Sequence, residues 1–228
     1  MPKERQKIMN RTGLTSALIT GSSRGLGLDI AKYLLSKGII VHLHGNDKRK
    51  LMLTAKLLGC KYVSCDLRNP QKSSSILARY AIDNKINIFI NNAGIKNKNI
   101  DEVISINLLS PIYLVQKIYD YLKKKKKGII VSINSLAGLS GNFNEAIYCA
   151  SKFGMRGFMQ SLQERCLEDN IKIYEFYFGA IKTDMTKDRS DYEKLIDPKE
   201  AAKLVCDSIL NYTTLYQKSQ VIKRTDIL

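Results

Sequence analysis

Short apolar runs rich in β-branched residues alternate with longer amphipathic stretches along this chain. Because parallel strands need crossover connections that helices usually supply, the alternation predicts a parallel sheet covered by helices. The predicted strands are residues 15–20, 39–44, 61–64, 86–90, 128–134, 171–177 and 219–223. The predicted helices are residues 25–37, 47–58, 70–83, 101–126, 145–168 and 197–211. We therefore expect an α/β fold: a doubly wound, mostly parallel sheet of about seven strands with helices on both faces.

Chain length indicates a single domain. The chain has 228 residues, which suffice for a substantial core and are too few for two domains of ordinary size. Prolines fall at predicted helix starts and glycines just past predicted helix ends, namely Pro70, Pro198, Gly38, Gly59 and Gly128. We assign residues 13–228 to the domain and residues 1–12 to a basic N-terminal extension, interpreted as a loose tail.

Positive charge is abundant but scattered. The net charge is +16, and its densest run, residues 123–127, ends a predicted helix where cations complement the helix dipole. A solvated helix end explains this run better than a nucleic-acid patch, so no nucleic-acid partner is expected. The diffuse positive field can still attract anionic nucleotides.

Cysteine and histidine usage indicates no metal site. The five cysteines form no Cys-x-x-Cys pair, and His42 and His44 lie two apart on a predicted strand, which is typical of packed strand residues. Reduced thiols and a cytoplasmic location are expected. No apolar stretch approaches the roughly 18 residues of a membrane span, and residues 1–12 lack the apolar core of a secretion signal, so no membrane partner is expected.

A glycine-rich turn, residues 20–27, follows the first predicted strand and opens the first predicted helix. Gly21, Gly25 and Gly27 permit a tight turn and a close backbone approach to a pyrophosphate, which the helix N-terminus stabilises. This position between strand and helix predicts a dinucleotide site.

The end of the second predicted strand indicates which dinucleotide is bound. An acid there would accept a hydrogen bond from a free ribose 2′-hydroxyl, whereas a cation favours a 2′-phosphate. Here the strand runs into Gly45 and Asn46 with no acid before Asp47, while Arg24 and Lys48 lie close in sequence to the turns involved. We expect NADP as the cofactor, with NAD possible.

A tyrosine and a lysine one helical turn apart provide a candidate proton donor. The Tyr-x-x-x-Lys pattern occurs five times, but only Tyr148 has a free hydroxyl residue, Ser135, thirteen positions upstream after an apolar run. Lys152 projects from the same helix face as Tyr148. Tyrosine has an ordinary pKa of about 10, so we expect the ammonium of Lys152 to lower the pKa of Tyr148, and Ser135 to hydrogen-bond a carbonyl oxygen.

From about residue 13 onward the chain resembles the short-chain dehydrogenase/reductase family, whose glycine turn, Thr-Gly-x-x-x-Gly-x-Gly, matches residues 20–27. The resemblance implies a Rossmann fold and a catalytic tetrad of Asn107, Ser135, Tyr148 and Lys152. In that family the tyrosine exchanges a proton with the substrate oxygen, the lysine also holds the nicotinamide ribose, and the asparagine positions a water.

The resemblance also implies the cofactor contacts. Asp66 matches the position that hydrogen-bonds adenine, and residues 91–94 match a segment bordering the cofactor. The usual Pro-Gly after the sixth strand is replaced by Phe178-Gly179, which removes a backbone constraint. The predicted contacts are Gly21, Ser23, Arg24, Gly25, Leu26, Gly27, Asn46, Asp66, Leu67, Asn92, Ala93, Gly94, Tyr148, Lys152, Gly179, Ile181 and Thr183.

These residues predict an oxidoreductase that moves a hydride between NADP(H) and a small carbonyl or alcohol substrate. The alternatives are a non-catalytic dinucleotide sensor or scaffold and, from charge alone, a nucleic-acid-binding protein. The chain lacks the Val-Asp-Gly-Gly ending typical of acyl-carrier-protein reductases in the family, which lowers a fatty-acid assignment. By resemblance, we expect a homodimer or homotetramer that pairs through the helices of residues 101–126 and 145–168.

Overall fold

The structure is a computed structural model that describes residues 13–210 and 216–224, so the predicted extension, residues 1–12, lies outside the described residues. The strands are β1 (Ser16–Ile19), β2 (Ile40–Gly45), β3 (Lys61–Ser64), β4 (Ile88–Asn91), β5 (Gly128–Ser135), β6 (Ile171–Phe178) and β7 (Ser219–Ile222). The α-helices are α2 (Gly25–Ser36), α3 (Lys48–Leu58), α4 (Pro70–Asp83), α5 (Ile100–Ile104), α6 (Ser110–Lys125), α7 (Ala146–Gln163) and α8 (Pro198–Leu210). Each predicted element is present, and its bounds differ mainly at the ends.

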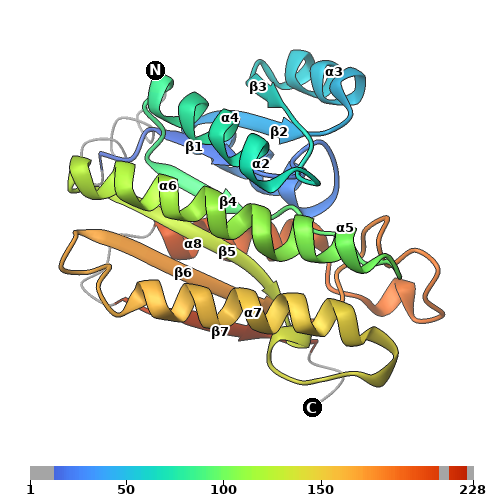
Figure 1. The fold of residues 1–228 in the computed structure, drawn as a ribbon. Helices are drawn as coiled ribbons and strands as arrows, with labels where there is room; N and C mark the ends of the chain where they lie inside the picture. Colours follow the sequence, from blue (N-terminus) through green and yellow to red (C-terminus); the bar gives the residue numbers. More distant parts are fainter. Residues whose placement is uncertain (1–12, 211–215, 225–228) are drawn as a thin grey trace.

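All seven strands run parallel in the order β3-β2-β1-β4-β5-β6-β7 (Figure 1). The chain winds outward from β1 to β3 and then returns to place β4 on the other side of β1. The winding therefore reverses between β1 and β4, and in open parallel sheets ligands bind at the carboxyl ends of the strands beside such a reversal.

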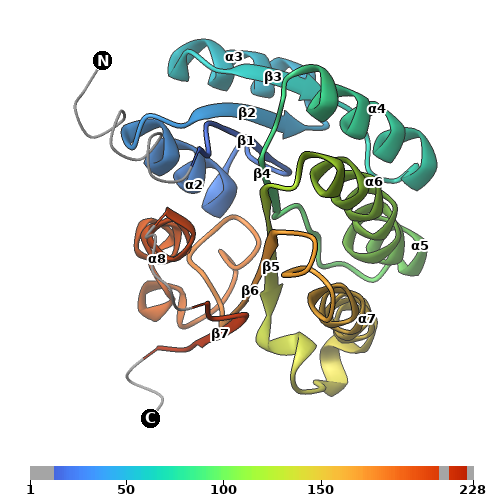
Figure 2. The ribbon, with the colours of Figure 1, turned by 90° about the vertical axis from the view of Figure 1, so that its left-hand side faces the viewer.

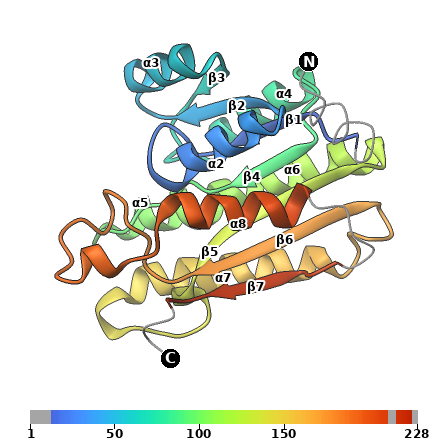
Figure 3. The same cartoon turned by 180° about the vertical axis from the view of Figure 1, so that it is seen from behind.

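Helices cover both faces of the sheet and enclose two apolar cores. One core joins the sheet to α2, α3 and α8, and the other joins the opposite face to α4, α6 and α7. Figure 2 shows the two layers on either side of the strands, and Figure 3 shows α2 and α8 in front of the sheet. The predicted single domain of a doubly wound fold is thus the observed architecture.

The ends of α3 are formed by residues typical of helix caps, whereas the C-terminal end of α6 differs from its prediction. Asp47 caps α3 by accepting a hydrogen bond from the Lys50 amide, and Gly59 ends that helix with a φ of +65°. Gly128 does not play the predicted capping role after α6, because Lys126 takes the left-handed conformation there, with a φ of +50°. Gly128 instead begins β5, where an added Cβ would come 2.7 Å from a methyl carbon of Leu122.

Two predicted helices are less regular than their hydrophobic periodicity indicates. The helix expected over residues 101–126 is divided by a π-helical turn, Ser105–Leu109, in which the Ser110 amide donates to the Ser105 carbonyl five residues earlier. The helix expected to reach residue 168 ends as α7 at Gln163, and turns lead into β6. None of the helices that the structure describes has the length and apolar character to cross a membrane.

A polar pair lies inside the buried strand β6. Glu175 is 1% and Tyr177 2% exposed, and among the described residues neither side chain has a hydrogen-bond partner of good geometry. Burial raises the pKa of Glu175 to about 7, and the nearby Tyr177 hydroxyl, Asn134 amide and Arg156 charge limit the rise. At neutral pH this carboxyl group is therefore partly protonated.

The substitution Glu175→Gln is expected to stabilise the protein at high pH. The pKa is raised on folding from 4.5 to about 7, so ionisation of the buried carboxyl progressively destabilises the wild type as pH rises through that window. Relative to the variant, the wild type is expected to lose about 3 kcal/mol of unfolding free energy by about pH 8. Urea denaturation across this pH range measures the difference. The exposed Glu168→Gln is the control, and parallel curves for wild type and Glu175→Gln would contradict the account.

Candidate active site

The glycine-rich turn brings the end of β1 against the segment that follows β4. Gly21 has a φ of +65°, and a Cβ added there would lie 2.9 Å from the Ala93 Cα. At Gly27 an added Cβ would lie 2.5 Å from the side-chain nitrogen of Asn92 and 2.6 Å from the Gly21 carbonyl oxygen. Only glycine fits this close backbone packing.

The N-terminus of α2 is left open by the turn. Asp47, Asn69 and Asn99 each cap the helix that follows them with a side-chain oxygen, whereas Arg24 makes no such bond at the start of α2. The first amides of this helix therefore have no side-chain cap among the described residues, and a helix N-terminus favours an anionic group. A glycine turn with an uncapped helix start fits the pyrophosphate of a dinucleotide.

Hydrogen bonds tie the turn to the predicted segment after β4. The amides of Asn92 and Ala93 each donate to the Thr20 hydroxyl oxygen, at 3.0 Å. The Asn92 side-chain amide donates to the carbonyls of Thr20 and Gly21, at 2.9 and 3.1 Å. Asn92 thus supports the turn, while Leu26 is buried in the core behind it.

The segment after β6 lies over the same turn. A Cβ added at Gly25 would lie 3.3 Å from the Thr183 methyl carbon, and the Arg24 guanidinium pairs with the Asp184 carboxylate at 3.3 Å. Both charged side chains are about two-thirds exposed, at 66% and 68%, so this ion pair contributes little to stability. Arg24 remains able to exchange Asp184 for another anion.

Backbone and hydroxyl bonds order this segment without the family's proline. The Gly179 amide is bonded to β7, and Ile181 forms a parallel bridge with Ile196. The Thr186 hydroxyl accepts from the Thr183 amide at 3.2 Å and donates to the Ile181 carbonyl at 2.6 Å. Sequence reasoning did not identify Thr186, which holds the two predicted contact residues together.

The residues predicted to face adenosine lie at the ends of β2 and β3. Asn46 is exposed just beyond β2, and the Ser23 hydroxyl lies 3.4 Å from the position of a Cβ added at Gly45. The Asp66 carboxylate pairs with the Arg68 guanidinium at 2.6 Å, and this contact lowers the pKa of Asp66. Leu67 is buried beside it.

The predicted catalytic residues come together from β5, the π-helical turn and α7. Asn107 is 2% exposed and exchanges two hydrogen bonds of 2.8 Å with the backbone of Ile95. A Cβ added at Gly94 would lie 3.4 Å from the Asn107 side-chain oxygen and 3.7 Å from the Lys152 Nζ. Gly94 therefore lets both side chains approach the strand end at which the glycine turn also lies.

Ser135 and Tyr148 lie close together at the carboxyl end of β5. Ser135 ends β5, where its hydroxyl accepts a hydrogen bond from the Ala137 amide at 3.2 Å. The nearby Ser135 hydroxyl limits the rise in the pKa of the Tyr148 phenol. The Lys152 Nζ lies 5.6 Å from the centre of the Tyr148 ring. Thus all four tetrad side chains border one edge of the sheet.

The structure contradicts the expected lowering of the Tyr148 pKa. Burial raises the pKa of Tyr148 to about 12 and lowers the pKa of Lys152 to about 8. The Lys152 Nζ lies over the ring face and donates to the Ile133 carbonyl at 3.4 Å, so it forms no bond with the phenol oxygen. Desolvation is the largest cause of both shifts and favours the neutral form of each group.

Asn134, which sequence reasoning also missed, holds two tetrad residues. Its side-chain oxygen accepts from the Ser135 amide at 2.8 Å, and its amide donates to the Lys152 carbonyl at 3.3 Å. Gly138 packs against both groups, since a Cβ added there would lie 3.0 Å from each oxygen. An asparagine before the serine on a buried strand was the available sequence signal.

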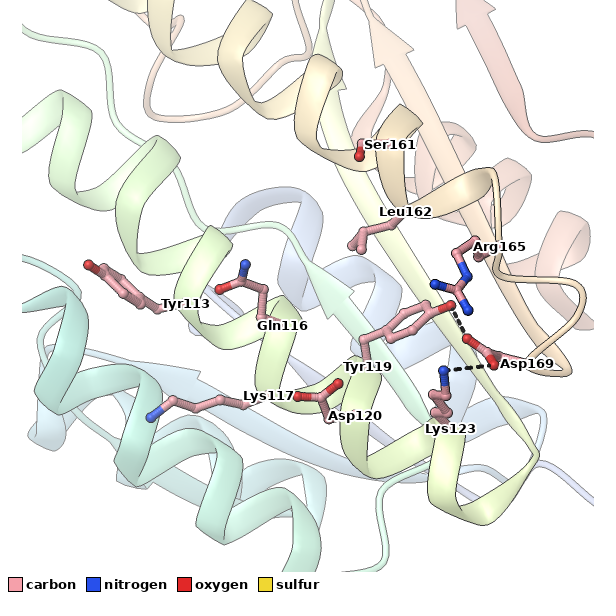
Figure 4. A pocket seen from close by; sticks show the side chains of 10 residues that line it. All are labelled: Tyr113, Gln116, Lys117, Tyr119, Asp120, Lys123, Ser161, Leu162, Arg165 and Asp169. Atoms are coloured by element: carbon pink, nitrogen blue, oxygen red, sulfur yellow. Dashed lines mark hydrogen bonds and ion pairs between the residues drawn. The ribbon is translucent and has the colours of Figure 1, made fainter.

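A cavity of about 500 Å³ lies elsewhere, on the outer side of α6 and α7. Figure 4 shows the side chains that line it, with Asp169 accepting from the Tyr119 hydroxyl at 2.6 Å and pairing with Lys123 at 3.1 Å. The tetrad does not line this cavity. The cavity lies on the face formed by α6 and α7, through which we expect copies of the chain to pair, and that pairing stays a prediction.

A parallel sheet with a dinucleotide turn and a tyrosine–lysine pair at one edge defines a nucleotide-dependent oxidoreductase. The family model for short chain dehydrogenases matches residues 15–194. The 3-oxoacyl-(acyl-carrier-protein) reductase of Rickettsia typhi is 34% identical over 186 residues, covering 77% of this chain and 76% of that protein. Nodulation protein G of Rhizobium meliloti is 34% identical over 182 residues, covering 75% and 74%. The chain belongs to the short-chain dehydrogenase/reductase family.

Solved structures share the same fold. A metagenomic short-chain oxidoreductase in complex with NADP has a TM-score of 0.78 and 25% identity, covering 94% of this chain and all of that one. A short-chain dehydrogenase from Sphingobium yanoikuyae in complex with NADPH has a TM-score of 0.79 and 23% identity, covering 91% and 87%. The second likeness concerns the fold alone.

Alanine substitutions at Gly21 and Gly59 separate backbone strain from steric collision. Both glycines have a φ of +65°, so each alanine costs about 1–2 kcal/mol of strain. Nothing lies within 4 Å of the Cβ added at Gly59, whereas the Cβ at Gly21 meets Ala93. We expect Gly59→Ala to lose only the stability that this strain costs. Gly21→Ala is expected to lose more stability and also dinucleotide binding. Thermal unfolding and fluorescence titration with NADPH test this, and equal losses in the two variants would contradict it.

Proposed function

We propose that the protein is an NADP-dependent reductase that transfers a hydride to the carbonyl carbon of a small substrate. The observation that carries the proposal is that two features meet at the carboxyl ends of the strands. One is the glycine turn, which leads into the uncapped start of α2, and the other is the tetrad, which comes from β5, the π-helical turn and α7. Either feature alone has structural explanations. Their occurrence together supports the proposal that a dinucleotide binds beside a proton donor.

Each tetrad residue has a distinct role in this proposal. NADPH, when bound, supplies the hydride. Tyr148 donates the proton that the reduced carbonyl oxygen gains, and the Ser135 hydroxyl hydrogen-bonds that oxygen while charge develops on it. Lys152 contributes positive charge and holds the nicotinamide ribose, and Asn107 orders the backbone at Ile95 beside Lys152.

The electrostatics of the site favour reduction. With a pKa raised to about 12, Tyr148 is a protonated phenol at neutral pH and so carries the proton that reduction consumes. Oxidation would require the same group to lose its proton first. An anionic cofactor beside Lys152 stabilises the ammonium form of this residue, which in turn makes the release of the proton easier.

NADP is preferred over NAD in this proposal. The chain carries no acid at the end of β2 before Asp47, and Arg24 stands at the glycine turn with an exposed, exchangeable ion-pair partner. A 2′-phosphate can replace the Asp184 carboxylate on the Arg24 guanidinium. The metagenomic relative crystallised with NADP supports the same choice.

For the substrate we propose 3-oxoacyl thioesters, the class named by the Rickettsia relative. Two apolar side chains, Phe143 five residues before Tyr148 and Met185 two residues after Thr183, are 98% and 48% exposed and are available to an acyl chain. The chain end departs from the acyl-carrier-protein reductases of the family, so other carbonyl compounds belong in the same screen. All five cysteines are free, which agrees with the reducing cytoplasm in which we place the reaction.

The substitution Tyr148→Phe tests the chemistry. We expect kcat to fall by at least about 100-fold while the Kd for NADPH changes less than about twofold, because the phenol acts on the substrate and not on the cofactor. NADPH absorbance is followed over a panel of 3-oxoacyl thioesters, ketones and aldehydes.

Tyr113→Phe is the matched control for this test. Tyr113 also precedes a lysine by four residues but lies on α6, away from the tetrad, so its variant is expected to keep full turnover. Full activity of Tyr148→Phe would refute the assignment. A wild type that binds NADPH yet reduces no member of the panel would support the non-catalytic sensor instead.

The substitution Arg24→Ala tests cofactor choice. We expect the Kd for NADPH to rise about tenfold more than the Kd for NADH, because only NADPH carries the phosphate that the guanidinium would bind. Arg79→Ala serves as the control, since Arg79 forms a comparable exposed ion pair with Asp83 on α4. Fluorescence titration gives both constants, and equal weakening of the two cofactors would overturn the NADP preference.

A further inference from the structure

One imidazole connects three strand ends beneath the candidate dinucleotide site. His44 lies near the end of β2 and is 2% exposed. The Gly21 amide donates to its Nδ1 at 3.3 Å, and its Nε2 lies 3.2 Å from the Cys65 carbonyl oxygen beyond β3. Its backbone is bonded as well, since the His44 amide donates to the Ser22 hydroxyl at 3.0 Å and the Ser22 amide donates to the His44 carbonyl at 2.9 Å.

The partners of the ring require one tautomer. Nδ1 faces a backbone N–H, so it must present its lone pair. The proton of the neutral ring is then on Nε2, which faces the Cys65 carbonyl oxygen at 3.2 Å and the Cys65 sulfur at 3.4 Å. Only the neutral imidazole satisfies both bonds, because a second proton on Nδ1 would oppose the Gly21 N–H. Burial lowers the pKa of His44 to about 4, which keeps the ring in this form at neutral pH.

The two bonded backbone groups belong to opposite ends of the site. Gly21 opens the turn that fits the pyrophosphate, and Cys65 directly precedes Asp66, the residue predicted to bond adenine. A buried amide prefers to keep its hydrogen bond, so Nδ1 fixes which way the Gly21 N–H points and thereby the plane of the peptide that begins the turn. No other described side chain joins these two segments by hydrogen bonds to both.

We propose that His44 is a positioning residue of the dinucleotide site: its neutral ring sets the glycine turn and the adenine-side segment in one fixed relation. This inference rests on the proposed function, since it assumes that the site binds NADP(H). His44 acts through the backbone of Gly21 and Cys65 and does not itself touch the substrate. It therefore supports the part of the cofactor that NADPH and NADH share.

The chain offers a matched control two residues away. His42 lies on the same strand, is also 2% exposed, and points to the same face. Its Nδ1 lies 3.0 Å from the Tyr80 hydroxyl of α4, so it joins the sheet to a helix and touches neither the turn nor Cys65. Burial lowers the pKa of His42 to about 4 as well. If His44 had only a structural role, substitutions of His44 and of His42 would have similar effects on stability and on cofactor binding.

The test compares His44→Leu, His44→Asn, His44→Gln and His42→Leu with the wild type. The asparagine oxygen stands near the place of Nδ1 and keeps an acceptor for Gly21, whereas glutamine keeps a donor near Nε2 only. For each protein, fluorescence titration gives the Kd for NADPH and for NADH, and thermal unfolding gives Tm.

We expect His44→Leu and His44→Gln to weaken the binding of both cofactors by about tenfold and to the same extent, because each leaves the partly buried Gly21 amide without its acceptor. His44→Asn is expected to stay within about threefold of the wild type. His42→Leu is expected to lower Tm while leaving both dissociation constants within about twofold. This equal loss for both cofactors distinguishes His44 from Arg24.

The proposal is overturned if His44→Leu binds NADPH as well as His42→Leu does, or if His44→Asn binds as poorly as His44→Gln. Should His44→Leu fail to fold, the comparison of the asparagine and glutamine variants decides. Failure of the proposed function has a different signature, because the wild type itself would then bind neither NADPH nor NADH.

Discussion

The hydrogen bonds between the Thr20 hydroxyl and the amides of Asn92 and Ala93 are the interaction on which the rest of the site depends. They join the two strand ends at which the winding of the sheet reverses, and they give the two backbone amides a hydrogen-bond acceptor there. Glycine at position 21 is a consequence of the same closeness, since no side chain fits between the two segments. Once these ends are joined, Gly94 brings the lysine and the asparagine of the tetrad to the same edge.

Burial and charge oppose each other at the reactive pair. Burial raises the pKa of Tyr148, so the tyrosine keeps its proton, and burial lowers the pKa of Lys152, so the lysine releases its proton more readily. Neither tendency suits proton transfer by itself. A nearby positive charge would lower the pKa of the Tyr148 phenol, and a nearby negative charge would raise the pKa of the Lys152 ammonium. An anionic nucleotide bound at the turn would supply the negative charge, and the ammonium that it stabilises would supply the positive charge. The protein thus contains a site whose electrostatics are completed by the molecule that it is proposed to bind.

Sequence patterns predicted the order and type of the elements because buried parallel strands and amphipathic helices leave strong periodic signals. They also predicted the glycine turn and the candidate group of Ser135, Tyr148 and Lys152, which depend on spacing, whereas Asn107 was predicted from the family resemblance alone. They did not predict the π-helical turn at Ser105–Leu109 or the left-handed Lys126, because both result from tertiary packing that overrides local preference. His44, Asn134 and Thr186 were missed for a related reason. Each acts through hydrogen bonds to backbone groups, and the backbone carries no signal of its own in a sequence.

The π-helical turn has an evolutionary consequence. A helix with one surplus residue is less regular than the helix that would result from deleting that residue, so loss of any one position between 105 and 109 would improve the local hydrogen bonding. The same deletion would rotate α5 by about 100° around the helix axis relative to α6. Asn107 could not then face Ile95 while α6 kept its place against α4. Length variation in this stretch is therefore barred by geometry, even where the individual side chains are free to change.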